Sequence, residues 1–265
     1  MKHGMKTFSG IFAAWFVLSA AFPADKAAGG EAPSRYEQPQ MRAATIYEAN
    51  SNKKHILYKF KRTVTQSGPV AKVLREFSYP DGKVAARERI VYDGDNLMSY
   101  ELEELQIHAR GAVKLRRDGK APGKGQIVFD YVTGTNSSGK TNANTESLRP
   151  DTLVGDMIAP FLVAHWNDLI KGQAVKCRLI VASRAETVGF TFEKHAESTW
   201  QGKPVVSIKM SPSSFIIAAL VDPLYFTMEK DGEHRVLQCD GRTTPKIKDR
   251  NKWKDLDAVT VFDWD

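Results

Sequence analysis

The stretch Met98-Ser99-Tyr100-Glu101-Leu102-Glu103 decides the fold class, because apolar and polar side chains alternate along it. A β-strand points successive side chains to opposite faces, so a period of two predicts a strand with one buried and one solvated face. The same alternation recurs at residues 56–61 and 224–229. The chain is therefore predicted to be mainly β.

Short turn sequences separate the alternating runs. Pro80-Asp81-Gly82, Asp93-Gly94-Asp95 and Asp231-Gly232 are typical of tight turns between strands. Loops this short join antiparallel strands, because parallel strands need long crossover connections. The apolar run at residues 215–221 fits either a short helix or a buried strand. We expect further strands at residues 125–132, 174–183, 187–193, 205–210, 234–239 and 258–264.

One helix is predicted near the middle of the chain. Asp151 or Thr152 could cap its start, and Gly172 follows its end. Pro160 lies inside it and is expected to kink the helix or split it in two. The apolar stripe recurs at helical spacing through Leu153, Met157, Phe161 and His165.

The first 24 residues have the pattern of a secretory signal peptide. Lys2 and Lys6 form a basic start, an apolar stretch covers residues 8–22, and Ala21 or Ala24 offers a small-residue cleavage site. The apolar stretch is shorter than the roughly 20 residues of a membrane-spanning helix. We expect an exported protein of the periplasm or the extracellular space. No Cys follows the cleavage region, so no lipid anchor is expected.

Residues 25–44 are rich in Ala, Gly, Pro and charge, which is typical of a disordered leader or linker. Residues 45–265 are expected to form a single domain, since 42% hydrophobic residues suffice for a large core. The formal charge of +7 falls to about +5 without Lys2 and Lys6. This charge is dispersed, so it favours weak contact with an anionic membrane surface and predicts no nucleic-acid partner.

Two cysteines, Cys177 and Cys239, lie in predicted strands on inward-facing positions. In an oxidising compartment they are candidates for one disulfide, which would stabilise the fold by about 4 kcal/mol in the chain-entropy model. Two buried thiols that pack as small apolar groups are the alternative.

The segment Gly134-Thr135-Asn136-Ser137-Ser138-Gly139-Lys140-Thr141 matches the phosphate-binding loop pattern letter for letter. Such a loop needs a helix after it, to aim backbone N–H groups at the phosphates. Residues 142–146 are polar and poor in helix formers, and the surrounding strands look antiparallel. We interpret the segment as a Gly/Ser/Asn loop and expect no nucleotide.

No set of residues forms a specific catalytic or metal-binding motif. The histidines are scattered without metal-ligand spacing, so neither a metal nor another cofactor is expected, and His165 is interpreted as a core or interface histidine. Glu101, Glu103 and Glu104 crowd one strand, where alternation places them mostly on the solvated face. A hydrolase with paired carboxylates stays open as an alternative, since such pairs need proximity in space alone.

Aromatic and Met side chains instead collect on one face of several predicted strands and on the helix. They would form either an ordinary packed core or, where sheet and helix do not fully meet, an apolar cavity for a lipid or acyl chain. The candidate lining residues are Phe129, Phe161, Trp166, Phe190, Phe192, Met210, Phe226 and Met228.

The layout of the chain resembles the bacterial lipoprotein-carrier half-barrels of the LolA, LolB and LppX type, and related periplasmic families of unknown function. The resemblance rests on the order of elements and on Val221-Asp222-Pro223-Leu224-Tyr225-Phe226, followed by Asp231-Gly232 and Asp240-Gly241-Arg242. It covers roughly residues 45–264 and transfers no individual functional residue. It implies a curved antiparallel sheet around helices, with a concave apolar face for lipid-like ligands.

The sequence therefore predicts a mainly β (α+β) half-barrel that wraps one or two helices. The expected function is non-catalytic binding of a lipid, a lipidated protein or another apolar ligand in the cell envelope. A structural or interaction module with a filled core is the first alternative, and an envelope hydrolase is the second.

Overall fold

The computed structural model describes residues 41–118, 124–134, 139–214, 218 and 221–264. Its strands form one fifteen-stranded sheet. The strands are β1 (Ala43–Glu48), β2 (Ile56–Ser67), β3 (Val70–Ser78), β4 (Val84–Asp93), β5 (Asn96–Glu104), β6 (Ala109–Arg117), β7 (Gly125–Thr133), β8 (Lys140–Ser147), β9 (Thr152–Leu153), β10 (Val175–Val181), β11 (Glu186–Trp200), β12 (Lys203–Pro212), β13 (Leu224–Glu229), β14 (Val236–Asp249) and β15 (Lys252–Asp263).

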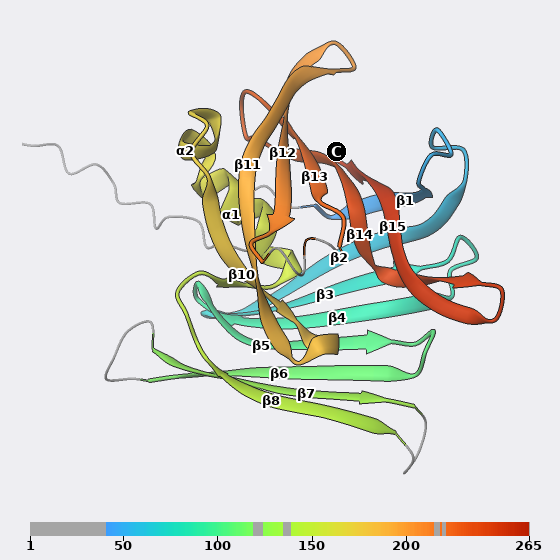
Figure 1. Ribbon diagram of the computed structural model, residues 1–265, viewed down its shortest axis with the longest axis vertical. Helices are drawn as coiled ribbons and strands as arrows, with labels where there is room; N and C mark the ends of the chain where they lie inside the picture. The colour runs from blue at the N-terminus through green and yellow to red at the C-terminus, as the bar shows by residue number, and fades with distance from the viewer. Residues whose placement is uncertain (1–40, 119–123, 135–138, 215–217, 219–220, 265) are drawn as a thin grey trace, which may run out of the picture. The chain divides into compact units, whose positions relative to one another are not determined.

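The sheet has two arms that meet where the first strand pairs with the last. The order runs from β8 through β1, then from β15 down to β9. We call β1–β8 the N-terminal arm and β9–β15 the C-terminal arm; they are blue to green and yellow to red in Figure 1. Strands pair antiparallel except β9 with β10, which are parallel. The predicted curved antiparallel sheet is therefore confirmed, and short turns explain it.

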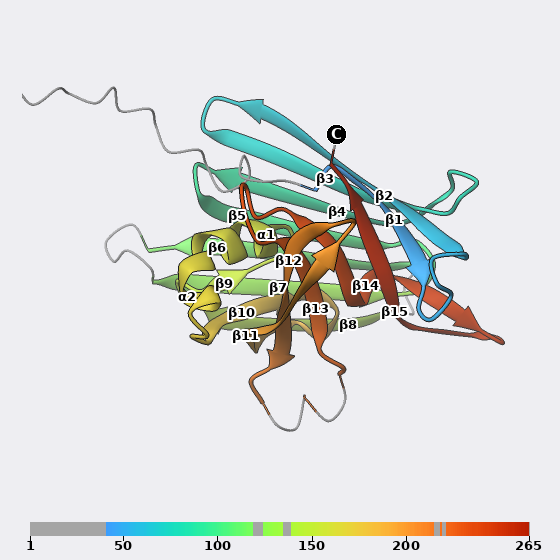
Figure 2. The ribbon, with the colours of Figure 1, turned by 90° about the horizontal axis from the view of Figure 1, so that it is seen from above.

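The sheet curves until its two ends approach each other, but no backbone ladder closes it. Edge strand β8 meets the 3₁₀ turn η3 (Ala182–Arg184) and the start of β11 through side chains. Asn142 and Asn144 donate hydrogen bonds to the carbonyls of Arg184 and Ala185, at 3.1 and 3.0 Å. We call this contact the β8–η3 seam; Figure 2 shows the two arms facing each other around the interior.

The observed strands follow the predicted alternation except at some strand starts: Ile56 is exposed, and Met98 is exposed where the register of β4 and β5 shifts. In β5, Tyr100 and Leu102 are buried, whereas Glu101 is exposed. The structure also extends several strands beyond the apolar runs: β11 continues to Trp200, and β14 and β15 form a long hairpin around Arg250. These extensions carry polar side chains on both faces, so alternation could not reveal them. Strand β8 is polar for the same reason, although it was expected as a loop.

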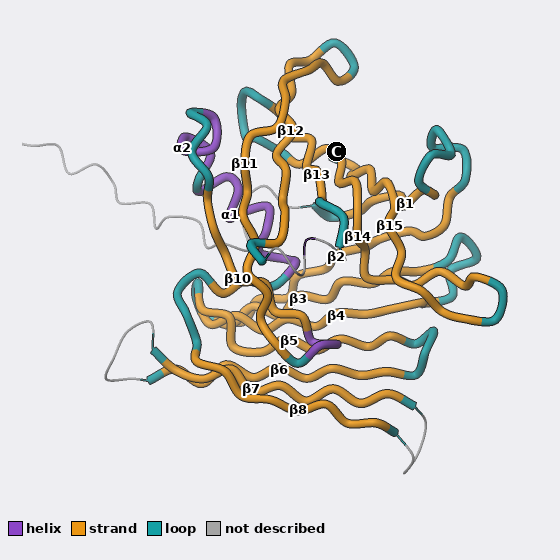
Figure 3. Tube along the Cα trace, in the orientation of Figure 1, coloured by secondary structure: helices purple, strands orange, loops and turns teal. Residues whose placement is uncertain are grey.

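The helical segment differs from its prediction in where it begins and where it breaks. Leu153 belongs to β9, and the helical segment starts with the 3₁₀ turn η2 (Gly155–Met157), followed by α1 (Ile158–Ala164) and α2 (Trp166–Ile170). Pro160 does not split the helix, because it lies in the first turn of α1, where a missing N–H costs little. The break falls at His165, and Gly172 follows the end with a positive φ of 81°. Figure 3 shows this small amount of helix among the strands.

Both arms pack around α1, which lies inside the curve of the sheet (Figure 2). Leu162 and Leu169 are fully buried among strand residues of both arms, including Phe129 and Phe192. A smaller second cluster surrounds Phe60 and involves β1–β4 and β15. The half-barrel thus has one well-packed core around the helix and a second around the junction of the arms.

The expected signal peptide and most of the expected leader lie outside the described residues. Strand β1 begins at Ala43, so the last two residues of the 25–44 leader belong to the sheet. Among the described helices, none is long and apolar enough to span a bilayer. Most of the run at residues 215–221 also lies outside the described part.

Candidate functional site

A cavity of about 490 Å³ lies between the two clusters of the interior. Strands of both arms line it, together with η2, η3 and the start of α1. This volume is within the ~300–1,000 Å³ of typical small-molecule sites. The apolar part of the wall includes Phe60, Phe77, Leu179, Phe190, Met210, Phe226 and Phe262.

Three of the eight predicted lining residues are in this wall, namely Phe190, Met210 and Phe226. The other five lie elsewhere. Phe129, Phe192 and Met228 are buried in the core around α1 and do not line the cavity. Phe161 packs against Phe192, with ring centroids 5.7 Å apart, and Trp166 stacks on His234 at 4.1 Å.

Charged side chains that were not among the predicted lining residues form the rest of the wall. Arg75 of β3 lies over the rings of Phe60 and Phe77, at 5.2 and 5.8 Å from their centroids. Its guanidinium donates a short hydrogen bond to Glu88 of β4. It also lies so close to Gly155 that a Cβ there would be 3.0 Å from Nη1. Glycine at position 155 therefore lets η2 approach the guanidinium.

Beneath this wall, Asp156 of η2 is the centre of a buried ion cluster. Its carboxylate accepts hydrogen bonds from Arg62 Nε at 2.6 Å and Nη2 at 2.9 Å, and from the Tyr92 hydroxyl at 3.0 Å. Arg75 Nε lies 3.8 Å from the same carboxylate. Burial alone would raise the pKa of Asp156, but the hydrogen bonds and charges of Arg62 and Arg75 outweigh it and lower that pKa. Asp156 therefore ties the helical segment to the N-terminal arm as a carboxylate.

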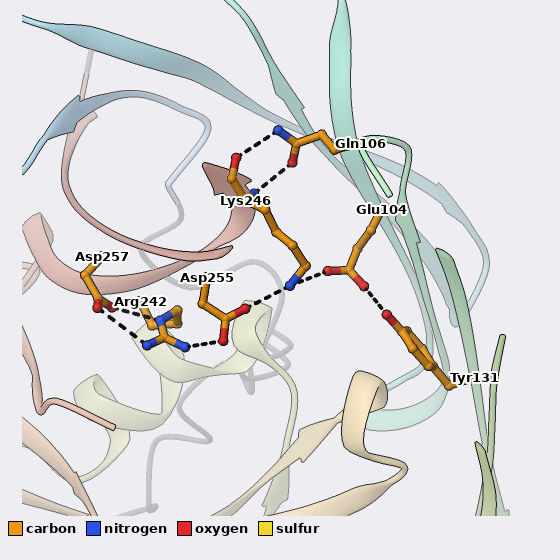
Figure 4. A network of polar contacts seen from close by, with 7 residues as sticks. All are labelled: Glu104, Gln106, Tyr131, Arg242, Lys246, Asp255 and Asp257. Atoms are coloured by element: carbon orange, nitrogen blue, oxygen red, sulfur yellow. Dashed lines mark hydrogen bonds and ion pairs between the residues drawn. The ribbon is translucent and has the colours of Figure 1, made fainter. Parts of the chain in front are cut away.

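A second network (Figure 4) joins the arms, and four of its members, Glu104, Arg242, Lys246 and Asp255, belong to the cavity wall. Glu104 of β5 accepts from the Tyr131 hydroxyl at 2.6 Å and pairs with Lys246 of β14 at 3.1 Å. Lys246 also pairs with Asp255 at 2.8 Å, and Asp255 pairs with Arg242 at 2.7 Å. Burial opposes the charge on Lys246, yet these carboxylates raise its pKa, so the network is ionic at neutral pH.

An irregularity in β14 brings Lys246 to this position. The register with β15 shifts between Thr243 and Lys246, which is typical of a β-bulge. The Thr244 hydroxyl donates to Glu88 at 2.7 Å, and the Lys246 N–H donates to Gln106 Oε1 at 2.8 Å. The bulge thus attaches the C-terminal arm to β4 and to the turn after β5.

The parity of the strands contained a signal for these charges. Arg75 alternates in phase with Val73 and Phe77, Glu88 with Ala86 and Ile90, and Glu104 with Tyr100 and Leu102. Each of these charged residues therefore occupies an inward position of its strand. The expectation for the glutamates of β5 is thus correct for the exposed Glu101 but wrong for Glu104, which is buried.

The other candidates from the sequence lie apart from the cavity, except Cys239, which is half-buried on β14 and belongs to the lining. Cys177 is buried on β10, and the candidate disulfide is not formed, because β11, β12 and β13 lie between β10 and the Cys239 strand, β14. Burial raises the pKa of both thiols to about 12.

Lys140 and Thr141 of the loop motif begin strand β8, and residues 135–138 lie outside the described part. Within the described residues, no cluster of His, Cys, Asp and Glu could hold a metal ion.

Comparisons of this chain with protein-family models, with curated proteins and with solved structures find no match.

Proposed function

We propose that this protein binds an amphipathic, lipid-like molecule in the cavity between its two arms, as a non-catalytic carrier or sensor of the cell envelope. The cavity carries the proposal, because most of its wall is apolar and the rest carries polar and charged side chains. Such a wall suits an acyl chain or another apolar body, and the few polar groups orient it. The layout resemblance to lipoprotein-carrier half-barrels, and the secretory pattern of residues 1–24, point to the same function and location.

The charged groups of the wall support binding rather than hydrolysis. A general acid needs a carboxyl group whose pKa is raised towards neutrality. At Asp255 burial acts in that direction, but the hydrogen bond and charge of Lys246 outweigh it and lower the pKa. Glu88 forms an ion pair with Arg75, and Glu104 forms one with Lys246.

The proposal is tested by narrowing the cavity. Leu179 is half-buried on β10 and lines the cavity, whereas Val175 is half-buried on the same strand and does not line it. Leu179→Trp should weaken binding of a neutral apolar dye such as N-phenyl-1-naphthylamine at least about tenfold, whereas Val175→Trp should leave it nearly unchanged. Fluorescence titration measures both. Equal affinities of the wild type and both variants would contradict binding in this cavity.

A further inference from the structure

Each charged side chain of the cavity wall is paired with an oppositely charged side chain, either in the wall or next to it. Arg75 pairs with Glu88, and Arg184 pairs with Glu186 at 2.5 Å. Lys246 lies between Glu104 and Asp255. The remaining charged side chain of the lining, Arg242, pairs with Asp255 and, at 2.8 Å, with Asp257 outside the lining.

The deeper cluster is balanced as well. Arg62 and Arg75 carry two positive charges, and Asp156 and Glu88 carry two negative charges. The side chains of Asp156 and Arg62 are only 3% and 5% exposed, so a ligand does not reach them. A net charge in the cavity would therefore find no uncompensated partner and would lose its own hydration.

The wall also offers neutral groups that suit an uncharged polar end. Three residues of the lining, Ser183, Thr243 and Thr260, carry aliphatic hydroxyls. A hydroxyl can both donate and accept a hydrogen bond, so these groups can bind an alcohol, ester or carbonyl oxygen. Ser183 lies on η3, Thr243 on β14 and Thr260 on β15, so all three belong to the C-terminal arm.

We propose that the cavity selects an electrically neutral amphiphile, with a hydroxyl- or ester-type polar end, over a fatty acid anion or an alkylammonium ion of the same chain length. This inference rests on the proposed function and names the class of its ligand. Charged amphiphiles bind only by breaking an existing ion pair of the wall, which makes them weaker ligands.

The test compares three probes with equal numbers of chain carbons: a monoacylglycerol, a fatty acid anion and an alkylammonium ion. Each is titrated into the purified protein at neutral pH, below its critical micelle concentration, with calorimetric detection. The monoacylglycerol should bind at least about tenfold more tightly than either ion, a difference of about 1.4 kcal/mol. Equal or tighter binding of either ion overturns the inference but leaves the proposed function standing. If none of the three binds, both fail.

A variant that unbalances the wall sharpens this test. Glu88→Gln removes one negative charge beside Arg75 and should shift the preference towards the fatty acid anion about tenfold. Asp255→Asn likewise removes one negative charge, here beside Lys246. Its side chain is half-exposed, so this variant replaces Glu88→Gln if Glu88→Gln does not fold. Asp249→Asn, in the same hairpin but outside the wall, is the matched control and should not alter the preference. An unchanged preference in folded Glu88→Gln and Asp255→Asn overturns the inference.

Discussion

The interior has two regions built from the same strands, one filled and one hollow. On β12, Ile208 is fully buried in the core around α1, whereas Met210, two residues further along, lines the cavity. On β4, Ile90 packs into that core, whereas Glu88 faces the cavity. The filled region has apolar side chains at its inward positions, whereas the inward positions around the cavity include paired charges besides apolar side chains.

Physical chemistry explains why the charged region stays open. An ion pair needs several hydrogen bonds in fixed directions, so its members cannot fill irregular space as aliphatic side chains do. Arg75 is fixed by two rings, by Glu88 and by the approach of Gly155. These contacts fix the part of the wall around Arg75. The apolar side chains of the rest of the wall therefore cannot close the space by packing onto Arg75.

The largest expected effect comes from the ion cluster that separates the two regions. Asp156→Asn should destabilise the protein by about 3–5 kcal/mol, because Arg62 would keep a buried charge without its carboxylate partner. Urea unfolding followed by circular dichroism measures the free energy of unfolding. Glu103→Gln, which changes a carboxylate on the outer face, is the control and should cost less than about 1 kcal/mol. Similar decreases in the free energy of unfolding in both variants would show that the buried ion cluster around Asp156 does not stabilise the protein more than a surface ion pair.

The comparison along β12 gives the next largest effect. Ile208→Ala should cost about 3 kcal/mol, because it creates a new cavity in a filled region. Met210→Ala should cost clearly less, since it only enlarges a space that already exists. Chemical denaturation of the two variants measures the difference. A loss at Met210 as large as that at Ile208 would mean that the space beside Met210 is packed.

Acid should weaken the charged region before the filled one. The folded-state pKa of Asp156 lies below its unfolded value near 3.9, so its contribution is present above about pH 4 and is lost as pH falls through the folded pKa. The wild type should therefore lose stability below about pH 4, with up to about 1.4 kcal/mol per pH unit from this one group. Thermal melts from pH 5 to pH 3 measure the slope, which should be shallower in Asp156→Asn. If stability falls equally steeply with pH in the wild type and in Asp156→Asn, Asp156 does not cause the acid sensitivity.

The smallest effect concerns the β8–η3 seam, which closes the hollow side of the half-barrel through side chains. Asn144→Ala removes the hydrogen bond to the Ala185 carbonyl and should cost about 1 kcal/mol. Thr145→Ala, at the exposed neighbouring position on the same strand, should change stability by less than about 0.5 kcal/mol. Amide hydrogen exchange in β8 should rise in the first variant alone. Equal exchange in both would show that the seam does not depend on Asn144.

Alternation and turn residues were sufficient to predict the class of this fold. The runs in β2, β5 and β13 each show apolar residues on one face, and the turns at Gly82 and Gly94 have the positive φ that favours glycine. Alternation could not reveal the polar parts of β8, β11 and β14. Hydrogen bonding to a neighbouring strand, rather than burial of one face, keeps these parts extended. The expected effect of Pro160 was wrong because its effect depends on the turn of the helix in which it lies.

The candidate site could be predicted only in part. Parity places Phe190, Met210 and Phe226 on the inner face, but it places Phe192 there equally well. Which inward residues border a space depends on contacts between strands far apart in the chain, such as Thr244 with Glu88. Inward charges on adjacent strands, Arg75 and Glu88, were the available signal for the hollow region, because a buried charge requires a partner nearby.

The most direct test of the account is to extract the purified protein with organic solvent and identify co-purified molecules by mass spectrometry. The account predicts a neutral amphiphile in a constant ratio to protein, and its loss from the Leu179→Trp variant but not from Val175→Trp. If the extract of folded protein contains no amphiphile and the protein binds none of the three probes, the proposed function is wrong. That result would favour an interaction module whose cavity binds no ligand.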